Sequence, residues 1–169
     1  MPQPPTIDRE EIEIIIATPE DWLAASEIRL ESLLRDPQAF GATYEEAVDR
    51  DEAGWRAWLS RSGLTMLLAR TVERPIGIVG ALREIDPDDS SVAMIVSMYV
   101  TATHRGQGVG RRLLQTLLAA LEDDPALTRA ILHVTPSQLS AQRLYASLGF
   151  VPVGKEDDEI VMVRPLSPR

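Results

Sequence analysis

A glycine-rich turn between a predicted strand and a predicted helix is the clearest chemical feature of the sequence. The turn reads Arg-Gly-Gln-Gly-Val-Gly at 105–110, and Arg111 and Arg112 follow it. Glycines let a backbone approach a ligand closely, and the free N–H groups of a helix's first turn add partial positive charge. The turn is therefore predicted to bind an anion; a purely structural strand-to-helix turn is the alternative.

The spacing of the glycines narrows the choice of anion. A Walker loop requires a lysine and then a hydroxyl residue after its last glycine, and neither follows Gly110. A dinucleotide-binding turn requires its third glycine where Arg111 stands. The pattern Arg-x-x-Gly-x-Gly directly after a strand fits neither motif.

The segments around the turn predict how it is held. The apolar run 91–100 predicts a strand, and leucines recurring at steps of one, three and four predict an amphipathic helix over 109–122. A second strand is predicted at 130–134. Strand, turn, helix and strand in this order form a parallel crossover, which is right-handed by default.

The other periodicities complete an α+β fold, a mixed and mostly antiparallel sheet flanked by helices with one parallel crossover at the glycine turn. Residues 1–10 are expected to form a flexible N-terminal arm and 11–169 a single domain. The further predicted strands are 12–16, 66–71, 76–82, 150–153 and 160–163, and the further predicted helices are 19–36, 44–48, a segment with Trp55 and Trp58 on one face, and 136–148.

Composition excludes several classes of function. The chain of 169 residues is 44% hydrophobic and 25% charged, as expected for one globular domain. It has no cysteine, and its two histidines, His104 and His133, have no carboxylates at ligand spacing, so no metal site is expected. No segment has the pattern of a signal peptide or a membrane span, so a cytoplasmic protein without a membrane partner is expected. A net charge of −9 argues against nucleic-acid binding.

The acidic residues are unevenly distributed. Asp and Glu are absent between Ser90 and Leu121 and again between Pro125 and Lys155, whereas they crowd into the first 52 residues. Core strands and helices exclude charge in any case, but an acidic protein that binds a polyanion must also keep acids away from that site. The acid-rich first part would favour a cationic partner.

Two motifs give the sequence a family resemblance. The turn 105–110 resembles the acetyl-CoA pyrophosphate loop of the GCN5-related N-acetyltransferase (GNAT) superfamily. The segment LHVTPSQLSAQRLYASLGFVPVG at 132–154 resembles the superfamily's Asn-x-x-Ala-x-x-Leu-Tyr…Gly-Phe block, and RLESLLRDPQAFGATYEE at 29–46 resembles one subset of these enzymes. The predicted order of elements over roughly residues 10–164 is also similar to the GNAT fold.

The resemblance implies acetyl-CoA as co-substrate, no metal, and acetyl transfer to a primary amine by direct attack in a ternary complex. Backbone N–H groups at 107–111 would bind the pyrophosphate, with glycines leaving room for it, and residues 98–100 would pair with the pantetheine arm where two strands splay apart. The implied cofactor-binding residues are Met98, Tyr99, Val100, Arg105, Gly106, Gln107, Gly108, Val109, Gly110, Arg111 and Gln138.

Two residues of the tail motif have alternative roles. Tyr145 matches the family tyrosine near the sulfur, which implies that it protonates the departing thiolate; a core tyrosine on an apolar helix face is the alternative. Gln138 stands where the family usually has Asn. Because Thr135-Pro136-Ser137-Gln138 also fits a capping box, Gln138 either contacts the cofactor or caps its helix.

The general base and the acceptor are less well defined. Many relatives place a carboxylate on the fourth strand, but 90–100 contains no Asp, Glu or His, so the base would be a water or one of Glu27, Glu31, Glu45, Glu46 and Glu84. The expected substrate-binding residues are Glu31, Phe40, Tyr44 and Glu84. The acceptor would be a small cationic amine or a protein or peptide amine, and a homodimer is left open. The second hypothesis is a non-catalytic acyl-CoA-binding or sensing module with the same fold.

Overall fold

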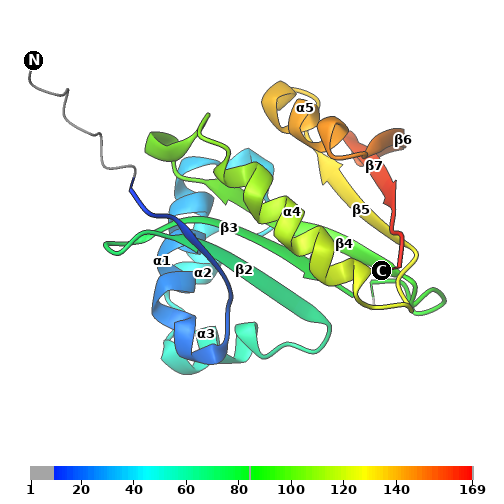
Figure 1. Ribbon diagram of the computed structural model, residues 1–169. Helices are drawn as coiled ribbons and strands as arrows, with labels where there is room; N and C mark the ends of the chain where they lie inside the picture. The colour runs from blue at the N-terminus through cyan, green and yellow to red at the C-terminus, as the bar shows by residue number, and fades with distance from the viewer. Residues whose placement is uncertain (1–9, 84, 169) are drawn as a thin grey trace, which may run out of the picture.

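One mixed sheet organises the computed structural model, which describes residues 10–83 and 85–168. Within these residues seven strands have the order β1-β2-β3-β4-β5-β7-β6 (Figure 1). Every neighbouring pair is antiparallel except β4 and β5, which are parallel. The strands are β1 (Glu13–Ile16), β2 (Leu64–Arg70), β3 (Pro75–Leu82), β4 (Val92–Val100), β5 (Arg129–Val134), β6 (Val151–Glu156) and β7 (Glu159–Pro165).

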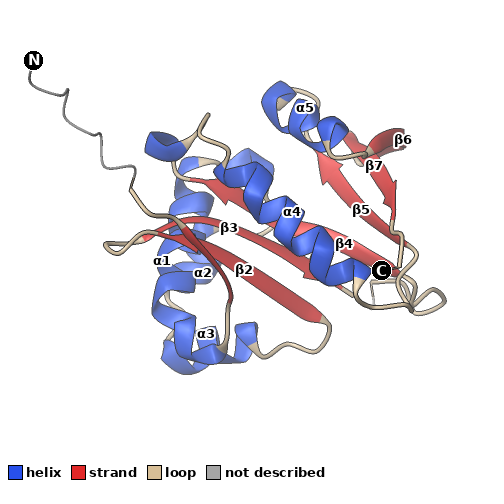
Figure 2. Ribbon diagram, in the orientation of Figure 1, coloured by secondary structure: helices blue, strands red, loops and turns tan. Residues whose placement is uncertain are grey.

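Helices cover both faces of the sheet (Figure 2). The α-helices are α1 (Trp22–Arg35), α2 (Tyr44–Val48), α3 (Glu52–Leu59), α4 (Val109–Glu122) and α5 (Leu139–Ser147), and short 3₁₀ turns lie at Pro19–Asp21, Pro37–Ala39 and Ala102–His104. On β2, Leu67 belongs to the core cluster under α4, whereas Leu68 belongs to the cluster under α1 and α3. Because both of its faces are buried, β2 is a continuous apolar run rather than an alternating one.

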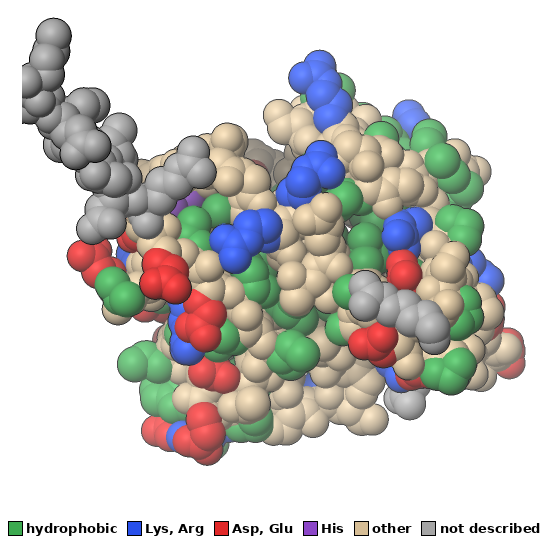
Figure 3. Space-filling model, in the orientation of Figure 1, with side chains coloured by type: hydrophobic (Ala, Val, Ile, Leu, Met, Phe, Trp, Pro, Cys, Tyr) green, Lys and Arg blue, Asp and Glu red, His purple; other side chains and the backbone are tan. Residues whose placement is uncertain are grey.

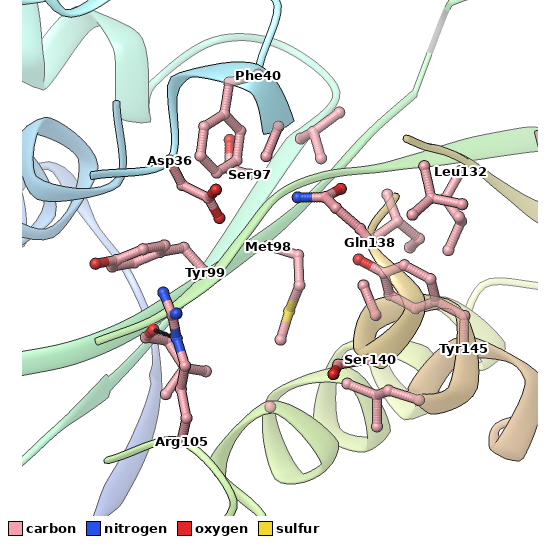
Figure 4. Close-up of a pocket in the computed structure, with 18 of the residues that line it drawn as sticks. Asp36, Phe40, Ser97, Met98, Tyr99, Arg105, Leu132, Gln138, Ser140 and Tyr145 are labelled. Carbon is pink, nitrogen blue, oxygen red and sulfur yellow. Dashed lines mark hydrogen bonds between the residues drawn. The ribbon is translucent and has the colours of Figure 1, made fainter. Parts of the chain in front are cut away.

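The two ends of α1 follow the signals in the sequence. The backbone N–H of Thr18 donates to the carboxylate of Asp21 at 2.8 Å, which forms the capping box of the 3₁₀ turn that leads into the helix. Asp36 ends the helix directly before Pro37, since the residue before a proline disfavours helical backbone angles. Asp36 thus lies at the C-terminal end of α1, and its side chain lies near Ser97 and Tyr99 of β4 (Figure 4).

β4 separates from β5 after only three residue pairs. The paired residues are Val92–Met94 on β4 and 129–131 on β5. The register between β3 and β4 shifts between Ile78 and Gly80, opposite Ser97, whose φ of 59° is in the left-handed region. A β-bulge bends its strand. The C-terminal part of β4 therefore has no hydrogen-bonded neighbour on the β5 side, which confirms the predicted splay.

Most predicted boundaries lie within three residues of the structure, and two differences have a local cause. The last helix begins at Leu139 rather than at 136. The closing hairpin was predicted at 150–153 and 160–163 but is longer, because Asp157 and Asp158, with φ of 47° and 66°, make a tight turn between β6 and β7. Residues 1–9 of the predicted N-terminal arm lie outside the described residues. At the end of that arm, the carboxylate of Glu10 lies 2.7 Å from Nε2 of His104.

Candidate active site

An open cleft of about 1060 Å³ lies where β4 and β5 separate. Its wall is built by β4, the glycine turn, the first turn of α4, β5, α5 and the segment that follows α1 (Figure 4). On the molecular surface, basic side chains gather over the α4 and α5 end and acidic ones over the β1 and α3 end (Figure 3). Most of the cleft lining comes from residues 94–145, where acids are scarce in sequence, and Asp36 and Glu159 are the acids that line it within the described residues.

The three glycines of the turn serve two purposes. Gly106 and Gly108 have φ of 74° and 82°, and a Cβ added to either would meet no atom within 4 Å. Both therefore satisfy a left-handed backbone while leaving open space at the start of α4, where Gly108 is the N-cap. Gly110 differs, because an added Cβ would lie 2.8 Å from Met98 Cε and 3.4 Å from Leu144 Cδ2. The absence of a side chain at Gly110 therefore also lets α4 pack against the cleft wall; Gly110 lines the cleft, and its contact with a ligand stays a prediction.

The arginines near the turn are held by different partners. Arg105 Nε donates to the carbonyl of Val100 at 2.8 Å, and its guanidinium carbon lies 5.4 Å from the centre of the Tyr99 ring. Arg111 Nη2 donates to Ser147 Oγ at 2.7 Å and so joins α4 to α5. Both side chains line the cleft. Gln107 is not among the lining residues, and its side chain donates to the carbonyl of Thr103 at 3.2 Å.

Tyr145 packs in the core and also lines the cleft. Its side chain is only 7% exposed, and its ring meets Phe150 edge-on with centroids 6.1 Å apart. Its hydroxyl has no hydrogen-bond partner among the described residues and points into the cleft beside Gln138 (Figure 4). Burial raises the pKa of the Tyr145 phenol to about 12. The ring is part of the core, and the proton on its oxygen is available to the cleft.

Gln138 does not form the predicted capping box. It occupies the N-cap position of α5 but makes no side-chain cap hydrogen bond. Gln142 Nε2 instead donates to the carbonyls of Thr135 at 3.2 Å and Pro136 at 2.9 Å. The Gln138 amide points into the cleft (Figure 4). The capping interpretation was wrong, and the amide is free to bind a ligand.

Asp36 and Phe40 line the end of the cleft that faces α1. The Asp36 carboxylate points toward the cleft near Ser97, on the opposite side of Met98 from Tyr145 (Figure 4). Among the described residues it makes no ion pair. The sequence interpretation missed this carboxylate because Asp36-Pro37 is equally well explained as a helix terminator.

Within the described residues, the acids that the sequence suggested as general base or acceptor-binding groups do not line the cleft. Glu31 lies close to Tyr99 but is not among the residues that line the cleft. Burial and the Glu31 carboxylate raise the pKa of the Tyr99 phenol to about 12. Tyr44 packs in the cluster with Leu33 and Trp55. The remaining candidates are either exposed or placed elsewhere: Glu27 and Glu45 are exposed, Glu46 closes a capping box with Thr43, and Glu84 lies outside the described residues.

Residues 27–150 match the model of the Acetyltransferase (GNAT) family. The chain belongs to this family. Human N-acetyltransferase 8 is 33% identical over 101 residues, which are 59% of this chain and 44% of the human protein. The match thus spans less than half the length of that relative.

Solved structures share the GNAT fold of this chain. A GNAT-family acetyltransferase from Streptococcus pneumoniae superimposes with a TM-score of 0.77 at 20% identity, covering 93% of this chain and all of the other. The PaiA N-acetyltransferase of Thermoplasma acidophilum, solved in complex with coenzyme A, gives a TM-score of 0.73 at 18% identity and covers 92% and 99% of the two chains. At these identities the likeness shows the fold.

The described part of this GNAT chain contains neither a cluster of metal ligands nor a membrane-spanning helix. No group of three or more His, Asp or Glu side chains is arranged to hold a metal ion within residues 10–83 and 85–168. Over the same ranges, every helix is too short or too polar to cross a membrane.

Proposed function

We propose that this chain is an acetyl-CoA-dependent N-acetyltransferase that acts on a primary amine by direct attack in a ternary complex. The observation that carries the proposal is one cleft that combines a glycine turn at a helix N-terminus, an unpaired strand edge and a cleft-facing phenol. Family membership supports the reaction class, and coenzyme A in the related Thermoplasma structure supports the co-substrate.

The residues of the cleft fit the parts of acetyl-CoA. The open backbone at Gly106 and Gly108, with the first turn of α4, would bind the pyrophosphate, and Arg105 and Arg111 would add positive charge. The free backbone groups of 98–100 on β4 would hydrogen-bond the amides of the pantetheine arm, as a neighbouring strand would. The Gln138 amide would add one side-chain contact to the same arm.

Acetyl transfer then needs two proton movements at opposite sides of the cleft. The amine nitrogen forms a bond to the thioester carbonyl carbon as the carbon–sulfur bond breaks. Asp36, or a water that it holds, would accept the proton that the amine loses, and Tyr145 Oη would donate a proton to the sulfur. Figure 4 shows these two side chains on either side of Met98, which suits a reaction centre between them.

Asp36 bears on the alternative of a non-catalytic acyl-CoA-binding module. That hypothesis was motivated by the absence of a carboxylate on the fourth strand, where many relatives have their base. A carboxylate from the end of α1 in the same cleft favours catalysis.

The experiment that tests the proposal incubates the chain with acetyl-CoA and a panel of amines. The panel would include polyamines, amino acids, aminoglycosides and peptides with a free N-terminus or lysine. Free coenzyme A and the mass of the acetylated amine are both measured, with hydrolysis in the absence of amine as the control. Tight binding of acetyl-CoA without any acetylated product would reject the enzyme in favour of the binding module.

A further inference from the structure

We infer that the amine acceptor also carries a carboxylate and that Arg29 binds it, so that the substrates are small amino carboxylates such as free amino acids. The inference rests on the proposed acetyltransferase function and names the acceptor class of the same cleft. It departs from the cationic acceptor that the acidic composition favours, because Asp36 is the one acid of the first half of the chain that lines the cleft within the described residues.

Arg29 is a cation that forms no ion pair within the described residues. It projects from α1 and lines the cleft, and its Nη1 atom is buried and makes no hydrogen bond among the described residues. No carboxylate in the same part of the chain forms an ion pair with it. Other arginines, such as Arg35 and Arg50, also lack an ion pair, but among the described arginines only Arg29 has a buried atom without a hydrogen-bond partner. Burying a charge without a partner is costly, and such a group commonly awaits a ligand.

The surroundings of Arg29 increase its need for an anion. Burial, together with the nearby charge of Arg50, lowers the pKa of the Arg29 guanidinium to about 10, so the group is still a cation at neutral pH. The guanidinium carbon lies 4.9 Å from the centre of the Phe40 ring. A cation–π contact recovers only part of the cost of removing a guanidinium from water, and it covers only one face of the group. Because Nη1 is buried, the edge formed by Nε and Nη2 is the one that would donate the two parallel hydrogen bonds that a carboxylate accepts.

The positions of Arg29 and Asp36 suit a zwitterion. Asp36 follows Arg29 by about two helical turns, so both side chains lie on the same side of α1, with backbones about 10 Å apart along the axis. Both line the cleft, with Phe40 next to each of them. The amine of an amino carboxylate would lie toward Asp36 and the reaction centre, and its carboxylate would lie toward Arg29. The glycine turn has its own arginines, Arg105 and Arg111, for the phosphates of the co-substrate.

The test compares each amino acid with its own carboxamide, for example leucine with leucinamide and phenylalanine with phenylalaninamide. The amine of a carboxamide is less basic, so more of it is neutral at a given pH, and a preference for the acid must come from recognition of the carboxylate. The kcat/KM of wild type should be about 10- to 100-fold higher for the amino acid than for its carboxamide, as expected from the energy of a charge-assisted hydrogen-bonded pair. In Arg29→Gln this ratio should fall to about one. Arg35→Gln, which removes an exposed arginine of the same helix, should keep the wild-type ratio.

The outcomes separate this inference from the proposed function. Carboxamides acetylated as fast as amino acids by wild type would overturn the inference and leave the acetyltransferase standing. An unchanged ratio in a folded Arg29→Gln would also overturn it. Acetylation of no amine at all would reject both. If Arg29→Gln does not fold, Arg29→Lys, which keeps the charge but loses the planar fork, should give an intermediate ratio.

Discussion

Replacing Tyr145 with Phe tests the proton donor with little disturbance of the fold. The substitution removes one hydroxyl and keeps the ring, so the edge-on contact with Phe150 survives. No hydrogen bond to another described residue is lost, and the free energy of unfolding should change by less than about 1 kcal/mol, the usual worth of one hydrogen bond. If the phenol protonates the departing thiolate, kcat should fall about 10²-fold, which corresponds to about 2.7 kcal/mol in the barrier.

The pKa of Tyr145 adds a second expectation. Because burial raises it to about 12, the phenol stays protonated at every working pH, and the rate of wild type should not decline through Tyr145 below about pH 10. Burial favours the neutral form of a thiol in the same way, so the donor and the leaving thiolate remain comparable in basicity inside the cleft.

The assay is steady-state acetyl transfer from pH 6 to pH 10, with calorimetry for acetyl-CoA and denaturant unfolding for stability. Tyr44→Phe is the matched control, because this tyrosine packs beside Trp55 and does not line the cleft. A folded Tyr145→Phe with wild-type kcat and wild-type acetyl-CoA affinity would refute the reasoning and leave Tyr145 as a core residue only.

Three further predictions concern the turn, the base and high pH. Gly108→Val should cost about 1–3 kcal/mol of stability, because a φ of 82° strains a residue with a side chain, and it should weaken acetyl-CoA binding in calorimetry. Gly154→Val, at an open position without positive φ, is the control. An unchanged acetyl-CoA Kd in Gly108→Val would argue against a pyrophosphate at the glycine turn. Asp36→Asn should lower kcat about 10²-fold in the same transfer assay while the acetyl-CoA Kd stays constant, and a wild-type kcat would exclude Asp36 as the base. Burial raises the pKa of the Tyr99 and Tyr145 phenols to about 12, against about 10 in the unfolded chain. Because only the unfolded chain ionises these phenols between about pH 10 and about pH 12, the free energy of unfolding should be at its full value below pH 10 and fall over this range, by at most about 2.7 kcal/mol for Tyr145. A double Phe variant that loses as much stability as wild type in denaturant unfolding over that range would contradict this last expectation.

Local signals in the sequence were sufficient for most of the fold. The leucine stripe after Gly108 predicts a helix over 109–122, and α4 spans these residues in the structure. The Asp36-Pro37 pair likewise marks the end of α1. The start of α5 was missed because Thr135 to Gln138 has the residue types of a capping box, in which side chains accept hydrogen bonds from backbone N–H groups. In the structure, the side chain of Gln142 instead donates to the backbone carbonyls of Thr135 and Pro136. Two local solutions with the same residues cannot be distinguished without the tertiary structure.

The residues at the Asp36 end of the cleft could not be predicted from the sequence, for a different reason. An arginine within a helix and an aspartate at its end are ordinary surface features in sequence, and only the packing of α1 against β3 and β4 brings Arg29 and Asp36 to the cleft. The bulge at Ser97 also has no local signal, since serine is not a residue that usually marks a left-handed backbone. Motifs shared with the family predicted residues that the structure places along the cleft, whereas Arg29 and Asp36 reach the cleft only through contacts between distant segments.

The short pairing of β4 with β5 has a mechanical consequence. The sheet is continuous through β1 to β4 and through β5, β7 and β6, but only the three pairs at 92–94 and 129–131 join these two parts along the strands. A ligand arm lying along the free edge of β4 and touching α5 would complete the missing seam and act as a brace between the two parts. The co-substrate would then stiffen the scaffold that carries both Asp36 and Tyr145, so the distance between base and acid becomes fixed only after it has entered. Under the proposed function, this architecture predicts an ordered mechanism, with acetyl-CoA binding first and the amine second.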